Sequence, residues 1–359
     1  MSEPGILPAQ DIRAMIERGE IAAEAAFADG QVQPASLDLR LSAKGWRARA
    51  SFLPGAGRAV TERLADFAMT EVDLTGGAAL ETGCVYLFPL MERLALPRGI
   101  SAAANAKSST GRLDLFVRVV TDRGVEFDTI PEGYEGPLYA EITPRAFSAL
   151  VRPGARLTQI RFRRGRAALD DAELKALHAA EPLVDGEARI DGGLAFSVDL
   201  LAKGDAPVGW RAKRSAPLID LDRIGHYDPE DFFTPVRPLK SGGIILDPGA
   251  FYILVSREAV SVPPLFAAEM TPYLAVAGEF RVHYAGFFDP GFGHTAAGGA
   301  GARGVLEVRC HEAPFALEHG QVVGRLVYER MTASPDVLYG QGLRSNYQGQ
   351  GLKLAKQFR

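Results

Sequence analysis

The sequence predicts a mainly β protein built from two tandem antiparallel barrels or sandwiches, with few short helices. Apolar or alternating runs of about four to eight residues are separated by Gly, Pro and Asp, which is typical of antiparallel strands joined by turns. The 39 glycines and 23 prolines in the 359 residues suit that many turns. Several short segments also recur in the same order, which indicates an internal duplication.

The first element expected is a short amphipathic helix over residues 10–21. Ile12, Met15 and Ile16 recur at helical spacing, with Asp11 as a suitable cap and Gly19 as a stop. Strand-like runs and turns follow it.

Five pairs of short segments carry the duplication. Residues 36–39, 45–49, 83–87, 139–142 and 151–157 resemble residues 197–200, 209–213, 249–253, 305–308 and 317–323. The second pair contains the only two tryptophans, Trp46 and Trp210. The offset grows from 161 to 166 residues, as expected for a duplicated domain with a few insertions.

These pairs predict three regions. Residues 1–185 form the first repeat together with a connecting helix near residues 170–178, and residues 186–330 form the second repeat. Residues 331–359 are rich in Gly, Gln and Lys and poor in apolar side chains, so they are expected to be a flexible tail.

The composition excludes several functional classes. A net charge of −4 and a sequence pI of 5.9 give no general attraction to nucleic acid or to anionic membranes. No signal sequence or long apolar run is recognisable, so a cytoplasmic location is expected. Cys84 and Cys310 are too few for a disulfide scaffold or a four-ligand zinc site, and are expected to be small buried residues.

The segment 107–112 is a candidate anion-binding site, and we call it the cradle. Lys107 and Arg112 flank the hydroxyls of Ser108, Ser109 and Thr110. Hydroxyls and an arginine fork suit phosphate oxygens, which accept several charge-assisted hydrogen bonds at once. The alternative interpretation is a solvated turn with an N-capping serine.

The second repeat lacks the cradle but offers a candidate acid or base. Glu307 lies between branched apolar neighbours, where burial would raise its pKa toward the range of a proton shuttle. The alternative is that Glu307 points to the wet face of an alternating strand, and Glu141 in the first repeat has the same two interpretations. His283 and Asp289 could form an acid–base or metal pair, although a lone strand histidine is more typical of a core. The zinc deaminase motif is missing, so hydrolysis on a base would activate water without zinc.

These segments together resemble the dCTP deaminase branch of the trimeric dUTPase superfamily, here with its module duplicated. The similar stretches are residues 33–41, 107–112, 285–292 and 305–308, with Tyr339 and residues 346–350. The resemblance implies two dUTPase-like β-barrel or jelly-roll domains of the β-clip type. It also implies sites shared between subunits, with a trimer favoured.

The resemblance assigns roles to individual residues. It implies that Glu307 activates the water that attacks C4 of cytosine, with Ser108 and Arg112 as further catalytic residues. The substrate-binding residues it implies are Lys107, Ser109, Ala285, Gly286, Asp289, Tyr339, Tyr347 and Gln350. Magnesium would be bound only through the triphosphate, with no protein metal site, and the tail would close over the phosphates as a lid.

Because the motifs are divided between the repeats, we expect composite sites that combine the cradle of one repeat with Glu307 of the other. Three other functions remain open: a dUTP diphosphatase or bifunctional enzyme that uses Asp289 and forms dUMP, a non-catalytic nucleotide-binding regulator, and a purely structural duplicated barrel. Regulation by dTTP or dUTP also remains open.

Overall fold

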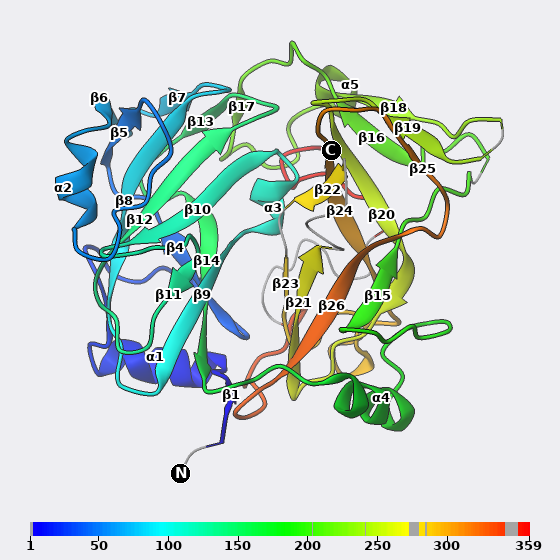
Figure 1. The fold of residues 1–359 in the computed structure, drawn as a ribbon, viewed down its shortest axis with the longest axis horizontal. Coiled ribbons are helices and arrows are strands. Elements are labelled where there is room, and N and C mark those ends of the chain that lie inside the picture. The colour runs from blue at the N-terminus through cyan, green and yellow to red at the C-terminus, as the bar shows by residue number, and fades with distance from the viewer. Residues whose placement is uncertain (1–2, 203, 241, 273–279, 284–285, 342–350) are drawn as a thin grey trace. The chain divides into compact units, whose positions relative to one another are not determined.

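The computed structural model describes residues 3–202, 204–240, 242–272, 280–283, 286–341 and 351–359. The chain divides into two compact units, shown in Figure 1. Unit 1 comprises residues 1–167 and 217–224, and unit 2 comprises residues 168–216 and 225–359. The predicted mainly β fold class is confirmed, because short strands dominate both units and the helices are few. No helix in these described ranges is long and apolar enough to cross a bilayer.

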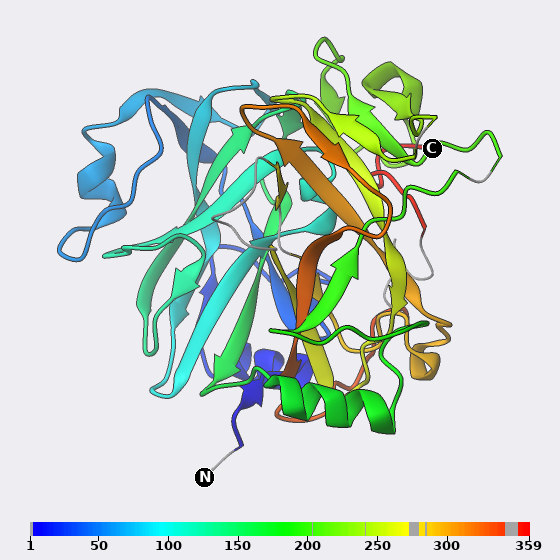
Figure 2. The ribbon, with the colours of Figure 1, turned by 45° about the vertical axis from the view of Figure 1, so that its right-hand side comes forward.

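Unit 1 contains two large sheets (Figure 2). Their strand orders are β11-β9-β14-β4-β3 and β10-β12-β8-β5-β6. β1 adds to β14, β2 adds to β8, and a small third sheet has the order β17-β13-β7. The strands are β1 (Gly5–Ile6), β2 (Ile21–Ala23), β3 (Val32–Gln33), β4 (Ser36–Arg40), β5 (Lys44–Ala48), β6 (Ala68–Asp73), β7 (Ala78–Leu80), β8 (Val85–Ala95), β9 (Ile100–Ala106), β10 (Leu115–Thr121), β11 (Thr129–Ile130), β12 (Glu135–Pro144), β13 (Ala149–Val151), β14 (Arg156–Arg164) and β17 (Ile219–Asp220).

Three short helices belong to unit 1: α1 (Ala9–Glu17), α2 (Val60–Leu64) and α3 (Ser108–Gly111). The predicted opening helix is confirmed, and its apolar side Ile12 and Met15 is buried. β4 contacts β8, and β9 contacts β10, so the two large sheets pack on one another. Leu37, Leu39 and Phe88 are fully buried. Alternating strands that bury one face produce this arrangement.

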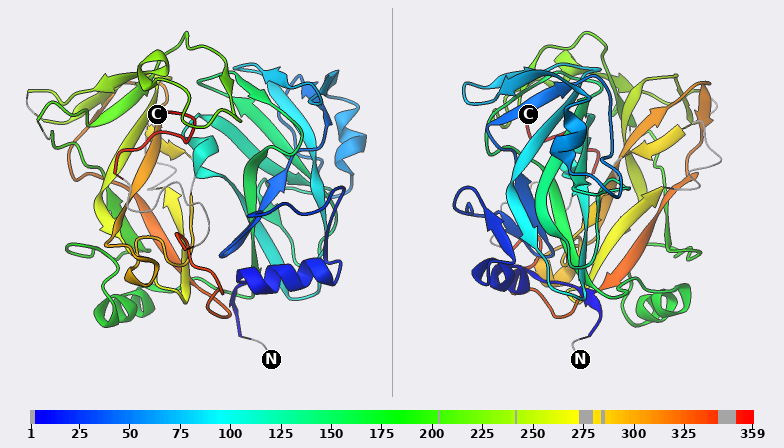
Figure 3. Two further views of the ribbon diagram at one scale, coloured as in Figure 1. Left: turned by 180° about the vertical axis from the view of Figure 1, so that it is seen from behind. Right: turned by 60° about the vertical axis from the view of Figure 1, so that its left-hand side comes forward.

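Unit 2 has sheets of strand order β15-β26-β21-β23, β18-β16-β20-β24-β22 and β19-β25 (Figure 3). Its elements are α4 (Asp171–Ala180), β15 (Leu194–Ser197), β16 (Gly209–Ala212), α5 (Pro229–Phe232), β18 (Phe233–Val236), β19 (Ile244–Leu246), β20 (Phe251–Val260), β21 (Phe266–Pro272), β22 (Phe280–His283), β23 (Phe287–Phe288), the 3₁₀ turn η1 (Thr295–Ala297), β24 (Ala302–Cys310), β25 (Phe315–Leu317) and β26 (Val322–Arg330). One apolar core that includes Phe196, Leu254 and Leu306 joins its two large sheets.

One row of cross-strand neighbours is equivalent in the two units, residue by residue. In unit 1 the row of paired positions is Trp46, Leu87, Glu141 and Arg118. In unit 2 it is Trp210, Ile253, Glu307 and His283. Both tryptophans and both glutamates therefore occupy equivalent positions, but an arginine in unit 1 is replaced by a histidine in unit 2.

One of the five predicted segment pairs is wrong in register. Arg156 and Val322 are equivalent residues in the last long strand of each unit. Arg156 pairs with Arg40, and Val322 pairs with Ser197, so Ser197 corresponds to Arg40 and residues 36–39 do not correspond to residues 197–200. A glutamate at equivalent positions of the two copies confirms the corrected match, since the backbone N–H of Arg40 donates to Glu92 and that of Ser197 donates to Glu258, each at 2.8 Å. The corrected offset between the two copies at this strand differs from the predicted offset by four residues. An even shift leaves every side chain on the same face, so the apolar pattern did not distinguish the two registers.

The predicted boundary at residue 185 is also corrected. The helix predicted as a connector is α4, which belongs to unit 2 and occupies the place that α1 has in unit 1. The backbone N–H of Leu7 donates to the carbonyl of Phe162 at 2.9 Å before α1, and that of Leu169 donates to Tyr328 at 2.9 Å before α4. The second copy therefore begins near residue 168.

Residues 217–224 leave the second half of the sequence and join unit 1 through β17, which pairs in parallel with β13. Arg152 forms a bidentate pair with Asp220 at 2.7 and 3.0 Å. This ion pair holds the pKa of Asp220 below its ordinary value.

The end of the chain is packed rather than mobile. Phe358 is 7 % exposed and lies against Tyr227, Phe232 and Phe233, with ring centroids 5.3 to 6.4 Å away. The prediction of a flexible tail is therefore wrong for residues 351–359, because no local pattern indicates that one aromatic residue near the end enters an aromatic cluster. Tyr347 and Gln350 lie outside the described residues.

Candidate functional site

The cradle forms one turn of helix, α3, at the end of β9. Its N-cap position is Lys107, not a serine, and the backbone N–H groups of Thr110 and Gly111 donate to the Lys107 carbonyl at 2.8 and 2.9 Å. Ser108 is exposed, whereas Ser109 is 9 % and Arg112 only 1 % exposed. The buried guanidinium of Arg112 carries its positive charge in a region of low dielectric, where electrostatic interactions are stronger than in water.

Lys107 is held by an acidic side chain of β4. Its Nζ forms a close ion pair and hydrogen bond with Oδ1 of Asp38, and Arg156 Nη1 lies 3.7 Å from Oδ2 of the same carboxylate. The Asp38 side chain is 3 % exposed, and that of Lys107 is 23 % exposed. The ammonium group of Lys107 is therefore engaged within unit 1.

Glu307 is a buried residue of β24 in unit 2. It is 4 % exposed, and its neighbours Leu306 and Val308 are fully buried. The predicted burial of this carboxylate is confirmed, and the wet-face alternative is wrong. The ladder places Ile253 on one side of Glu307 and His283 on the other.

Glu141 is the equivalent residue of unit 1, and it is also buried, at 2 % exposure. Its carboxylate pairs with Arg118, the residue opposite it on β10. Arg118 Nη2 also donates to the Ser51 hydroxyl at 2.7 Å, and the guanidinium lies 3.5 Å from the ring centroid of Phe127. Glu141 is thus part of a charge-paired network closed by cation–π contact.

The segment between β5 and β6 covers this network. Phe52 and Phe67 stack with ring centroids 4.8 Å apart, and Val60 and Leu64 of α2 belong to the same apolar cluster. Leu87 and Tyr139 belong to that cluster. Burial raises the pKa of Tyr139 to about 12, consistent with the exclusion of water from this face.

A second group of predicted residues lies together in unit 2. Asp289 is 8 % exposed and precedes a turn in which Gly291 has φ of 95°, a conformation that favours glycine. Tyr339 packs against Phe292 of this turn with ring centroids 5.6 Å apart, and its backbone N–H donates to Pro290 at 2.8 Å. The predicted residues Asp289 and Tyr339 are therefore neighbours.

Gly286 lies in the described part of this region, where its carbonyl accepts from the backbone N–H of Met270 at 3.1 Å. The neighbouring Ala285 lies outside the described residues. The cradle belongs to unit 1, and Glu307, Asp289 and Tyr339 belong to unit 2.

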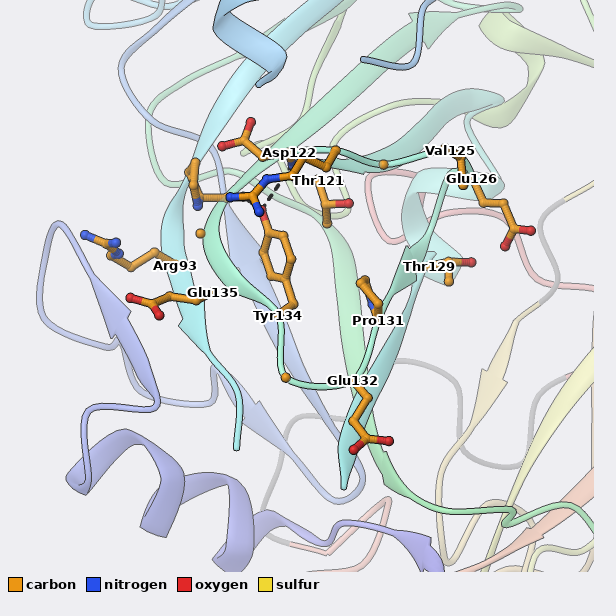
Figure 4. Close-up of a pocket in the computed structure, with 15 residues that line it drawn as sticks. Arg93, Thr121, Asp122, Val125, Glu126, Thr129, Pro131, Glu132, Tyr134 and Glu135 are labelled. Atoms are coloured by element: carbon orange, nitrogen blue, oxygen red, sulfur yellow. Dashed lines mark hydrogen bonds between the residues drawn. The ribbon is translucent and has the colours of Figure 1, made fainter. Parts of the chain in front are cut away.

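The corresponding turn of unit 1 lines an open groove of roughly 760 Å³ (Figure 4). Tyr134 stands at its centre, where its hydroxyl donates to the Pro137 carbonyl at 2.6 Å and accepts from the backbone N–H of Asp122 at 3.1 Å. Burial raises the pKa of Tyr134 to about 12. The charged side chains of the groove are two arginines and four carboxylates, so its lining is net negative and does not favour an anionic ligand: Arg93, Arg123, Asp122, Glu126, Glu132 and Glu135.

Two family models match nearly the whole chain. The 2′-deoxycytidine 5′-triphosphate deaminase N-terminal domain matches residues 3–166, and the corresponding C-terminal domain matches residues 170–358. The chain belongs to the dCTP deaminase family. Its two halves are thus the two domain types of this family, in agreement with the two units of the structure.

Known dCTP deaminases show different degrees of similarity. A crystal structure of 2′-deoxycytidine 5′-triphosphate deaminase from Agrobacterium tumefaciens is 57% identical, with a TM-score of 0.88 over 91% of this chain and 99% of that chain. The dCTP deaminase of Haloarcula marismortui is 29% identical over 44% of this chain and 79% of its own. A dUMP-forming dCTP deaminase of Pseudarthrobacter chlorophenolicus is 32% identical over 37% of this chain and 70% of its own.

The structure adds two residues to the candidate site of this deaminase. Arg118 could have been found by comparing the two copies, because Arg118 lies opposite Glu141 in the first copy and His283 lies opposite Glu307 in the second. Asp38 stands within a recognised motif, but its contact with Lys107 joins positions that are far apart in the sequence. No spacing pattern could have predicted that contact.

Proposed function

We propose that the chain converts dCTP and water to dUTP and ammonia, with Glu307 as the general base and without zinc. The observation that carries this proposal is the different cross-strand neighbour of the two equivalent buried glutamates, which is Arg118 for Glu141 and His283 for Glu307. Glu141 forms an ion pair with Arg118, whose guanidinium also donates to the Ser51 hydroxyl. A base must be able to accept a proton from water, so the carboxylate of the second copy is the one suited to catalysis.

The reaction requires two proton transfers from oxygen to nitrogen, each through Glu307. Glu307 accepts one proton from water as the oxygen attacks C4 of cytosine and the C4=N3 electron pair moves onto N3, and it passes that proton to N3, which gives a neutral tetrahedral intermediate. Glu307 then takes the proton of the new C4 hydroxyl and delivers it to the leaving amino group, so the C–N bond breaks as the C4=O bond forms, and ammonia and dUTP are released. Burial of Glu307 among apolar neighbours favours this role, because a low-dielectric surrounding lowers the cost of protonating the carboxylate.

The cradle is proposed to bind the triphosphate and to position the attacking water. Ser108 and Ser109 supply hydroxyls, and Arg112 supplies a fixed positive charge. Its donors suit phosphate oxygens rather than a metal ion, so magnesium is proposed to enter on the triphosphate, where it would offset phosphate charge. The remainder of the nucleotide is assigned to the turn at Asp289 and to Tyr339.

A second candidate product is dUMP. Several curated relatives, including that of Pseudarthrobacter chlorophenolicus, carry the name dCTP deaminase, dUMP-forming. This reaction would require a second water to attack the α-phosphate.

A product assay distinguishes the two reactions. Incubation of the full chain with dCTP and magnesium is expected to release one ammonia per dCTP consumed, with dUTP accumulating and no pyrophosphate. Equal release of ammonia and pyrophosphate would establish the dUMP-forming reaction instead. Nucleotide binding without either product would leave only the regulatory function.

A further inference from the structure

We propose that Asp38 is a positioning residue of the deaminase, and that through Lys107 it fixes the cradle for the triphosphate. This inference rests on the proposed function of the cradle. It assigns Lys107 to the support of α3 rather than to direct contact with phosphate. The observations that carry it are the buried Asp38–Lys107 ion pair and a comparison of the two copies.

The ion pair acts at the residue from which α3 begins. The Lys107 carbonyl accepts both first backbone bonds of the helical turn, and its N–H donates to Leu157 on β14 at 3.0 Å. Asp38 on β4 then fixes the side chain of the same residue. With backbone and side chain both held, the direction of α3 is set, and so are the hydroxyls of Ser108 and Ser109. A helical turn of four residues has little intrinsic stability, so it depends on such external contacts.

The carboxylate itself is rigidly placed. β4 pairs with β14 through Asp38 and Gln159, and the Asp38 side chain is almost fully buried. Arg156 approaches its second oxygen at 3.7 Å. A buried carboxylate with two cationic neighbours keeps its charge and its orientation, which is what a support for a binding loop requires.

The second copy provides an internal comparison. The corrected strand register places Ala195 where the first copy has Asp38, and Val322 where it has Arg156. The second copy also has no Lys-Ser-Ser-x-x-Arg sequence. The carboxylate, its arginine neighbour and the cradle thus occur together in one copy and are all replaced in the other. If Asp38 served only the stability of the strand, its replacement would not be expected to accompany the loss of the cradle.

A double-mutant cycle tests the support role. Asp38→Asn and Lys107→Met are each expected to raise the KM for dCTP about tenfold with a smaller change in kcat, because a displaced cradle weakens triphosphate binding. The double variant is expected to be no worse than either single variant, since both remove one contact. Lys107→Arg, which can keep the ion pair, is expected to retain the wild-type KM within about twofold.

Asp199→Asn serves as the matched control. Asp199 pairs with Arg303 at 2.5 Å in unit 2, the copy that has no cradle sequence, and its side chain is 11 % exposed. Burial alone would raise the pKa of Asp199, but the N–H of Leu201 and the charge of Arg303 outweigh burial and lower it. This control is expected to leave the KM unchanged, so it separates loss of a carboxylate pair in general from loss at the cradle.

Two results would overturn the inference. One is an unchanged or decreased KM in Asp38→Asn, because removing a negative charge then only aids anion binding. The other is a double variant whose KM rises by the product of the single effects, because Lys107 then contacts phosphate independently of Asp38. If Asp38→Asn does not fold, the KM values of Lys107→Met and Lys107→Arg are compared instead. Equal KM values for these two variants would contradict the support role of the ion pair. Failure of the proposed function is distinct, because wild-type protein would then not release ammonia from dCTP.

Discussion

Replacing Glu307 with glutamine is expected to lower kcat for ammonia release from dCTP by a factor of about 10² to 10⁴, the contribution typical of a general acid–base group. Glutamine has nearly the same shape and cannot accept the proton from water. Binding of dCTP should persist, because the cradle and the Asp289 turn are unchanged. The measurement is steady-state ammonia release at saturating dCTP and magnesium.

The matched control is Glu141→Gln, the same substitution at the equivalent position of the first copy. We expect it to keep kcat within about twofold, because Glu141 serves Arg118 rather than water. Full activity in Glu307→Gln together with loss of activity in Glu141→Gln would reverse the assignment of the two glutamates.

Replacing Arg118 with alanine is expected to destabilise unit 1 strongly. The substitution leaves the Glu141 carboxylate, with a side chain only 3 % exposed, without the arginine that now pairs with it. Removal of one partner of a buried pair costs about 3–5 kcal/mol, and we expect the lower end, near about 3 kcal/mol, because the Arg118 side chain is 23 % exposed. Thermal unfolding followed by circular dichroism should show a decreased Tm for this unit.

A second substitution shows whether the lost stability comes from the unpaired charge. Arg118→Ala combined with Glu141→Gln should recover part of the Tm, because a neutral amide is less costly to bury than a carboxylate. If the double variant is less stable than Arg118→Ala alone, the cation–π contact with Phe127 and packing, rather than the charge pair, hold this face together.

The fold and the duplication were predictable because both depend on local sequence patterns. Turn residues separate short apolar strands, and the tryptophan and glutamate rows repeat with an almost constant offset. The register at residues 36–39 was not predictable, because a shift of four residues keeps the same faces buried. The packing of Phe358 was also not predictable, because it depends on aromatic rings more than 120 positions earlier in the chain.

The candidate site was predictable to a lesser extent. The sequence placed a carboxylate in each copy and a cradle in the first, and a resemblance to dCTP deaminases joined them. The residue patterns alone did not distinguish Glu141 from Glu307, because both stand among the same residue types, and only the resemblance assigned the catalytic role to Glu307. The structure adds that Arg118 pairs with Glu141 and donates to Ser51, so these contacts join three distant segments.

The central proposal is that the cradle of the first copy binds the triphosphate and that Glu307 of the second copy is the general base, so that the repeats supply one set of these groups per chain. The most direct test is the number of dCTP molecules bound per chain, measured by calorimetric titration of the Glu307→Gln variant in the presence of magnesium. The account predicts one dCTP per chain. Two dCTP molecules bound per chain with equal affinity would contradict it, because the second copy would then bind nucleotide without a cradle of its own.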